Sequence, residues 1–203
     1  ATFDKYSYLE KGIKKADGEI WLTYCGTLGR SYDIPCVIDA LALLRERNCR
    51  IPEFIIIGDG PQKPEFEEYA RNKQVNCRFL GRVPYDEMCA VLYRSDITVN
   101  PIVANAAQSI INKHADYAAS GLPVINTQDS EEYRALVDRY DMGFNCINGS
   151  AKDIADKLEI LINNKEIRLK KGAGARKCAK EKFDRKISYS TLVNVILQPL
   201  NQR

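Results

Sequence analysis

One stretch of the chain, residues 105–125, places several polar side chains at helical spacing just before a predicted strand. Lys113 lies four residues after Ser109. Asp116 lies four residues after Asn112 and three after Lys113, so all four side chains can share one face of a helix. Free N–H groups at a helix N-terminus, with a hydroxyl and an ammonium beside them, form a site for an anion such as phosphate. A carboxylate about two turns into the helix can accept hydrogen bonds from sugar hydroxyls.

Phosphate at one end of such a helix and a ribose further along describe a nucleoside diphosphate. An ordinary amphipathic helix with a solvated polar face explains the same spacing equally well. The helix itself is predicted to begin at Ser109 as the N-cap. It is predicted to end near Gly121, which suits the left-handed position after a helix, with Pro123 just beyond.

A second candidate site is the glycine loop Gly26-Thr-Leu-Gly29, which follows a predicted strand and precedes a predicted helix. Glycine allows backbone N–H groups to approach a phosphate closely. The loop lacks the Gly-x-Gly-x-x-Gly spacing of dinucleotide-binding folds and the Gly-Lys-Ser/Thr of ATP-binding loops. The sole histidine, His114, has no triad partner in view, so a packed or surface residue is favoured over a catalytic base.

Six short apolar segments alternate with predicted helices along the chain. They cover residues 20–25, 54–57, 77–80, 97–99, 123–125 and 143–147. Strands that are apolar throughout and separated by helices predict an α/β fold, a Rossmann-like doubly wound parallel sheet covered on both faces. Ligands of such sheets bind at the carboxyl ends of the strands. The loops at Gly26, Gly60, Gly81 and Ser109 are therefore expected at one edge of the sheet.

Three helices are expected after the last strand. One begins after Ser150, one covers about residues 165–182 with interruptions at Gly172 and Gly174, and the last covers about 186–197. The last is apolar on more than one face, which indicates that it packs on something beyond this sheet. The predicted division of the chain is a connector at 1–18, a sheet domain at 19–183 and a C-terminal helix at 184–203.

Composition narrows the class of protein. Apolar residues make up 45% of the 203 residues and charged residues 28%, as in soluble globular proteins, and the net charge of +3 gives no strong case for nucleic acid. The basic run at 165–186 indicates a solvated helix surface, with contact to anionic lipid as the alternative. Seven cysteines without a Cys-x-x-Cys pair favour reduced thiols over disulfides or zinc. Without an apolar run of about 20 residues or a signal peptide, a cytoplasmic protein is expected.

The ordered set of motifs resembles the donor-binding half of GT-B glycosyltransferases of the retaining family 4 type. The set is Gly-Thr-Leu-Gly at 26–29, Gly-Asp-Gly-Pro at 58–61, Phe-Leu-Gly-Arg-Val at 79–83, Asn-Pro at 100–101, and Ser-x-x-Asn-Lys-x-x-Asp-Tyr-x-x-x-Gly at 109–121. The resemblance extends over nearly the whole chain from about residue 18. Within the family, these motif sequences are similar to those of bacterial enzymes of capsule, O-antigen and exopolysaccharide assembly.

The resemblance implies roles for two residues eight positions apart. The family's second acidic residue, which holds the ribose hydroxyls, corresponds to Asp116. Its first acidic residue, which lies against the donor sugar and is the candidate catalytic position, corresponds to Gln108. An amide can hydrogen-bond to a sugar hydroxyl but carries no charge.

The resemblance also implies where the diphosphate and the base lie. Cations that many members place after the first strand are replaced here by Thr27 and Tyr32, so the charge is assigned to Lys113, with Arg30 as a weaker candidate. The backbone at Val83 matches the site that meets the base. The residues expected to bind the donor are Gly26, Thr27, Gly29, Arg30, Val83, Ser109, Ile110, Lys113 and Asp116.

The function implied is retaining transfer of a hexose from a nucleoside diphosphate sugar, with UDP slightly favoured over GDP, in the synthesis of a cell-surface polysaccharide. No metal cofactor is expected, since no Asp-x-Asp occurs. The acceptor is expected to bind an N-terminal half that is absent from this chain, so the chain alone should bind but not transfer. The alternative is a non-catalytic nucleotide-binding or interaction module of the same fold, which Gln108 favours. A sugar-nucleotide epimerase is disfavoured because no convincing acid and base pair is present.

Overall fold

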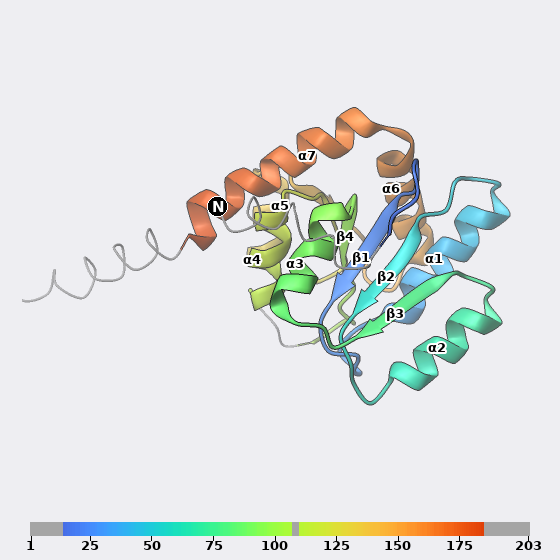
Figure 1. The fold of residues 1–203 in the computed structure, drawn as a ribbon. Coiled ribbons are helices and arrows are strands. Elements are labelled where there is room, and N and C mark those ends of the chain that lie inside the picture. Colours follow the sequence, from blue (N-terminus) through green and yellow to red (C-terminus); the bar gives the residue numbers. More distant parts are fainter. Residues whose placement is uncertain (1–13, 107–109, 185–203) are drawn as a thin grey trace, which may run out of the picture.

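The computed structural model describes residues 14–106 and 110–184, which fold around one parallel sheet (Figure 1). The strand order is β3-β2-β1-β4-β5-β6. The strands are β1 (Trp21–Cys25), β2 (Glu53–Ile57), β3 (Cys77–Gly81), β4 (Ile97–Asn100), β5 (Val124–Asn126) and β6 (Gly143–Asn145), and every neighbouring pair is parallel. The predicted Rossmann-like sheet of six strands is confirmed, and each strand lies within two residues of its predicted bounds.

Helices cover both faces of the sheet (Figure 1). They are α1 (Ile34–Glu46), α2 (Lys63–Asn72), α3 (Tyr85–Arg94), α4 (Asn112–Ser120), α5 (Glu131–Arg139), α6 (Ala151–Asn163) and α7 (Lys165–Cys178), which continues into a π-helical turn, Ala179–Phe183. One core joins the sheet to α1, α2 and α6, and the other joins it to α3, α4, α5 and α7. Along β1, Leu22 and Tyr24 enter the first core and Trp21 and Cys25 the second, because successive side chains of a strand point to opposite faces.

Successive strands are added toward one side of the sheet from β1 to β3 and toward the other side from β4 to β6, so the topology switches between β1 and β4. The loops that follow these two strands contact each other. The Asp33 N–H donates to the Pro101 carbonyl at 2.9 Å, and the Val103 N–H donates to the Ser31 carbonyl at 3.1 Å. Doubly wound sheets bind ligands outside the carboxyl ends of the strands at this reversal. The fold therefore places the glycine loop after β1 and the start of α4 after β4 at the expected position.

Backbone hydrogen bonds also join the loops that follow β1, β2 and β3. The Gly26 N–H donates to the Ile57 carbonyl at 2.9 Å, and the Gly58 N–H donates to the Gly81 carbonyl at 2.8 Å. Gly58 has a φ of 133°, and a Cβ at this position would lie 1.8 Å from the Gly26 carbonyl oxygen. A glycine at 58 is thus required for the loops to approach so closely.

Gly58→Ala is expected to lower the free energy of unfolding by about 1–2 kcal/mol more than Gly149→Ala does. Both glycines have a positive φ, but a Cβ at Gly149 meets nothing within 4 Å. The control therefore shares the positive φ but not the clash, and the 133° φ of Gly58 adds strain of its own. Urea unfolding of the two variants measures the difference, and equal stabilities would contradict this account of the loops.

The C-terminal helices differ from the sequence prediction. Helix α7 is continuous through Gly172 and Gly174, which were expected to interrupt it. A Cβ at Gly172 would lie 2.2 Å from the Gly121 carbonyl oxygen, and one at Gly174 would lie 2.1 Å from the Tyr140 carbonyl oxygen. These glycines therefore serve close packing of α7 on neighbouring backbone rather than a break. The predicted C-terminal helix and most of the predicted connector lie outside the described residues, so the domain division stays a prediction.

All seven cysteines are free thiols, and five of them are buried. Within the described ranges, no helix is long and apolar enough to cross a membrane. Residues 14–106 and 110–184 contain no cluster of three or more histidine, cysteine or carboxylate side chains that could hold a metal ion.

Candidate functional site

The site lies at the carboxyl edge of the sheet, where α4 begins opposite the loop after β1. Helix α4 starts at Asn112 with Ile111 at the cap position, so the prediction that Ser109 caps it is wrong. His114 takes over the capping role, since its Nδ1 accepts from the Ile111 N–H at 3.2 Å. A side-chain acceptor three residues into a helix reproduces half of a capping box. Gly121 ends the helix with a φ of 71°, as predicted.

His114 is fully buried and its ring stacks on Tyr133, with ring centroids 3.5 Å apart. Burial, with a smaller effect of the neighbouring Lys113 charge, lowers the pKa of His114 to about 3. Because Nδ1 accepts a hydrogen bond, the proton of the neutral ring is assigned to Nε2. His114 is thus a neutral residue that fixes the start of α4; of the packed or surface positions favoured from the sequence over a catalytic base, the structure shows the packed one.

Lys113 extends from the first turn of α4 to the glycine loop. Its Nζ is buried and has no hydrogen-bond partner in the described part of the chain. It lies 4.3 Å from the centroid of the Tyr24 ring and 3.9 Å from that of Tyr32. A Cβ on Gly26 would be only 2.9 Å from this Nζ. Burial lowers the pKa of Lys113 to about 7. The structure therefore brings together Gly26 and Lys113, which the sequence predicted to share a site.

Asp116 lies nearly one turn further along α4, facing the start of α3. The Tyr85 hydroxyl donates to Asp116 Oδ1 at 3.0 Å. Burial raises the pKa of Asp116, partly offset by this hydrogen bond. Tyr85 itself is 55% exposed. Val83, two residues before Tyr85, is half-buried and packs on the second core. Tyr85, close in sequence to the predicted base contact at Val83, thus contacts the predicted ribose-binding residue Asp116.

The glycine loop contributes less than expected. The N–H groups of Gly26 and Leu28 donate to the carbonyls of Ile57 and Asp59, so neither is available for a phosphate. The expected approach of backbone N–H groups to a phosphate is therefore not open to Gly26 and Leu28. The remaining predicted residues of this loop are accessible: Thr27 and Arg30 are exposed and Gly29 is half-exposed.

The other predicted site residues lie near the start of α4. Ile110 is half-buried beside the helix cap. Gln108 and Ser109 lie outside the described residues, and their predicted contacts with the donor stay predictions.

Sequence reasoning missed a buried group of amide side chains at the ends of β4 and β5. The Asn100 Nδ2 donates to Asn126 Oδ1 at 2.9 Å and to Gln128 Oε1 at 3.0 Å, and it lies 3.1 Å from His114 Nε2. Asn100 and Gln128 of this group contact the imidazole that caps α4. The signal in the sequence was an asparagine at the end of each of these two strands. Tyr24 and Tyr85 were also missed, because each acts through a contact with α4 that is distant in sequence.

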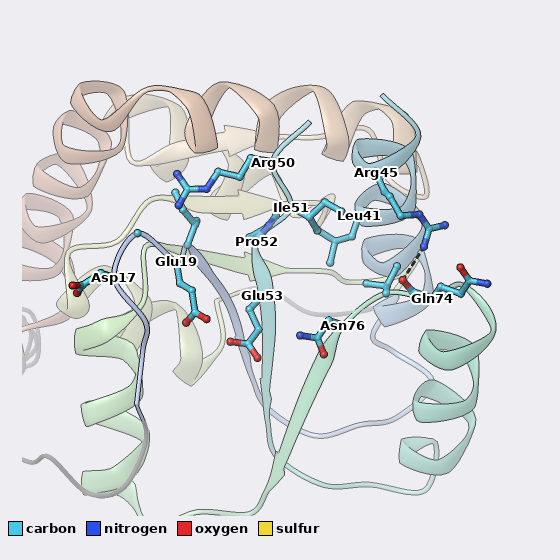
Figure 2. Close-up of a pocket in the computed structure, with 13 residues that line it drawn as sticks. Asp17, Glu19, Leu41, Arg45, Arg50, Ile51, Pro52, Glu53, Gln74 and Asn76 are labelled. Atoms are coloured by element: carbon cyan, nitrogen blue, oxygen red, sulfur yellow. Dashed lines mark hydrogen bonds between the residues drawn. The ribbon is translucent and has the colours of Figure 1, made fainter. Parts of the chain in front are cut away.

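A cavity of about 590 Å³ opens at the opposite edge of the sheet, beside the amino ends of β1, β2 and β3 (Figure 2). Two of its charged side chains, Glu53 and Arg45, already have partners in the fold. Both carboxylate oxygens of Glu53 accept hydrogen bonds from Arg78 at 2.8 Å, and Arg45 donates to the Gln74 carbonyl at 2.7 Å. The loops predicted to bind a ligand all lie at the other edge.

The family follows from a match over most of the chain. A profile described as "Glycosyl transferases group 1" matches residues 19–164, which include β1 to β6 and the start of α4. The chain belongs to this glycosyltransferase family. No curated protein matches the sequence as a relative.

Solved structures of glycosyltransferases share the fold. WaaG, a glycosyltransferase involved in lipopolysaccharide biosynthesis, has a TM-score of 0.74 at 18% identity, covering 93% of this chain and 50% of its own. HepE of Anabaena in complex with UDP has a TM-score of 0.75 at 17% identity, and the match covers 88% of this chain and 49% of HepE. The catalytic domain of the cholesterol-α-glucosyltransferase of Helicobacter pylori has a TM-score of 0.65 at 20% identity, and the match covers 79% of this chain and 96% of that domain. This glycosyltransferase chain thus spans about half the length of WaaG and HepE and has the GT-B fold of their matching half.

Proposed function

We propose that this chain binds the nucleoside diphosphate of a sugar donor at the carboxyl edge of the sheet, between the loop after β1 and α4. The observation that carries the proposal is the buried Lys113 ammonium, which lies beneath Gly26 without a hydrogen-bond acceptor. A buried cation without a partner is unfavourable in the free protein, and phosphate oxygens would supply the missing charge and acceptors. Asp116 accepts hydrogen bonds from the ribose hydroxyls, with Tyr85 beside it.

The donor is a UDP sugar in this proposal, with a GDP sugar as the alternative. The structural neighbour HepE of Anabaena has been solved with UDP and with UDP-glucose, which supports this choice. The motif order resembles retaining family 4 enzymes of cell-surface polysaccharide assembly, and the neighbour WaaG is involved in lipopolysaccharide biosynthesis. We therefore assign to the whole enzyme a retaining hexosyl transfer onto a growing polysaccharide, in the cytoplasm and in contact with the inner face of the plasma membrane.

In the transfer, the bond between the sugar C1 and the β-phosphate oxygen breaks, and the diphosphate leaves with an added negative charge. The Lys113 ammonium and the N-terminal end of α4 stabilise that charge without a metal ion. The hydroxyl oxygen of the acceptor, which is bound by an N-terminal half, forms the new bond to C1, and its proton passes to the departing diphosphate. The present chain alone is therefore a donor-binding domain without transfer activity.

Isothermal titration of the 203-residue chain against UDP, GDP and ADP tests the proposal. We expect UDP to bind with a dissociation constant of about 1–100 μM, as is usual for enzyme substrates, and ADP to bind at least about tenfold more weakly. Failure of all three nucleotides to bind would contradict the proposed function.

The non-catalytic module of the same fold is a second candidate, because Gln108 stands where the family places a carboxylate against the donor sugar. Hydrolysis or transfer of the sugar by the complete enzyme separates the two. If Gln108→Glu creates activity that the wild-type enzyme lacks, the non-catalytic reading is supported.

A further inference from the structure

The Lys113 ammonium is held between two tyrosine rings, which we call the aromatic pair, Tyr24 and Tyr32. The ring centroids of the pair are 5.6 Å apart and the planes meet at 64°, so the rings form two walls of a corner. The Lys113 Nζ lies within 4.3 Å of one and 3.9 Å of the other. Both distances are well inside the about 6 Å at which a cation is attracted to the face of a ring.

The rings are held in place by other parts of the fold. Tyr24 is fully buried in β1, and its hydroxyl donates to the Thr27 carbonyl at 2.7 Å. Tyr32 is held through its backbone, since its N–H donates to the Gly29 carbonyl at 3.0 Å and it pairs with Ile102 in an isolated bridge. The pair is therefore positioned by the glycine loop and the loop after β4 rather than by Lys113.

The groups around the ammonium supply little opposing charge. From β1, the Cys25 thiol is neutral, because burial raises its pKa far above neutrality. From α4, His114 is neutral, because burial lowers its pKa to about 3, and Asp116 interacts with Tyr85. From the loop after β1, Asp33 interacts with the start of α1, where Oδ1 accepts from the Cys36 N–H at 3.1 Å, and Arg30 is exposed. The two ring faces are thus the main groups that stabilise the charged form of Lys113.

We propose that Tyr24 and Tyr32 are positioning residues that fix the Lys113 ammonium beneath Gly26 and keep it charged up to about neutral pH, and so set the strength and pH range of diphosphate binding. This inference rests on the proposed function. Tyr32 stands at a position where the resemblance implies a cation in related enzymes. In this chain an aromatic ring at that position would instead support a cation supplied by α4.

The affinity for UDP is expected to depend on pH, because Lys113 is buried and lies where the diphosphate is proposed to bind. Burial lowers the pKa of Lys113 to about 7, and a diphosphate lying over Gly26 favours the charged form. Above neutral pH the free domain therefore loses the proton that the complex retains, so binding takes up a proton and the affinity for UDP falls as the pH rises. Between about pH 7 and pH 9 the terminal phosphate of UDP is about nine-tenths or more ionised and adds little to this change.

Isothermal titration of UDP and uridine into wild type, Tyr32→Leu and Tyr32→Phe at pH 7 and pH 8.5 tests the inference. Tyr32→Leu removes the ring face, whereas Tyr32→Phe, the conservative variant, restores it. We expect Tyr32→Leu to bind UDP about 3- to 30-fold more weakly, with uridine affinity unchanged, and Tyr32→Phe to remain within about threefold of wild type. Equal UDP affinity in the two variants, or an equal loss for uridine and UDP, would overturn the inference.

The wild-type chain provides a test that needs no variant. Titration of UDP at pH 8.5 in buffers of different ionisation enthalpy measures the protons taken up on binding. Uptake approaching one proton supports the inference, and zero uptake overturns it. If wild type binds no UDP, GDP or ADP at all, the proposed function fails and the inference fails with it; binding without proton uptake contradicts the inference alone.

Discussion

Replacing Lys113 with methionine is expected to weaken the binding of UDP about ten- to a hundred-fold and, at the same time, to stabilise the fold. The loss of affinity follows from removing the interaction between a cation and a phosphate, about 1.5–3 kcal/mol. The gain in stability follows because the wild-type ammonium is buried without an acceptor among the described residues. Methionine fills a similar volume without a charge, so the free energy of unfolding should rise by about 1–2 kcal/mol at pH 7.

The predicted change in stability also depends on pH, in a direction set by the pKa of Lys113 in the folded and unfolded chain. In the unfolded chain Lys113 has a pKa of about 10.4, and in the folded chain burial lowers it to about 7. Between these values the unfolded state binds more protons, so this lysine makes the wild type more stable as the pH rises from 7 toward 10. Lys113→Met should lack that increase. Urea unfolding at pH 7 and pH 9 measures both effects.

Lys152→Met is the control, because the Lys152 side chain is 77% exposed and forms an ion pair with Asp156, one turn away on the same helix. Its stability should stay within about 0.5 kcal/mol of wild type at both pH values. A Lys113→Met variant less stable than wild type at pH 7 would show that the ammonium supports the fold rather than a ligand.

Asp116→Ala is expected to weaken the binding of both uridine and UDP by about ten- to a hundred-fold. Both ligands contain the ribose, whose hydroxyls are proposed to donate hydrogen bonds to the Asp116 carboxylate. Both should therefore lose affinity. Tyr85→Phe is the matched control, since it removes the 3.0 Å hydrogen bond to Asp116 but keeps the carboxylate. We expect its affinity to remain within about threefold of wild type. Isothermal titration measures all of these, and a folded Asp116→Ala variant with unchanged affinity would remove Asp116 from the site.

Strands such as β2 could be predicted from the sequence because they are short apolar runs bounded by glycine, proline or polar residues. Phe54 and Ile56 enter one core while Ile55 and Ile57 enter the other, so a strand buried on both faces has no polar positions to obscure the pattern. The end of α4 could be predicted for a local reason as well, since Gly121 adopts the left-handed conformation that glycine tolerates. These features depend only on neighbours in the sequence.

The parts that could not be predicted depend on contacts between distant residues. Ser109 has the side chain of an N-cap, but the helix begins after Ile111, and the buried imidazole of His114, three residues further on, provides the acceptor. Gly172 resembles a helix breaker in the sequence, yet its lack of a side chain lets α7 lie against Gly121. Spacing placed Lys113 at the site, but only the fold shows the ring of Tyr32 beside its ammonium.

The central claim is that α4 holds phosphate through Lys113 and ribose through Asp116 at one site. Its most direct test is the affinity of wild type, Lys113→Met and Asp116→Ala for uridine and for UDP, measured by isothermal titration at pH 7. The account predicts that Lys113→Met loses affinity for UDP alone, whereas Asp116→Ala loses affinity for both ligands by a similar factor. If Lys113→Met weakens uridine as much as UDP, or if neither variant weakens UDP, then a nucleoside diphosphate does not bind α4 in this way.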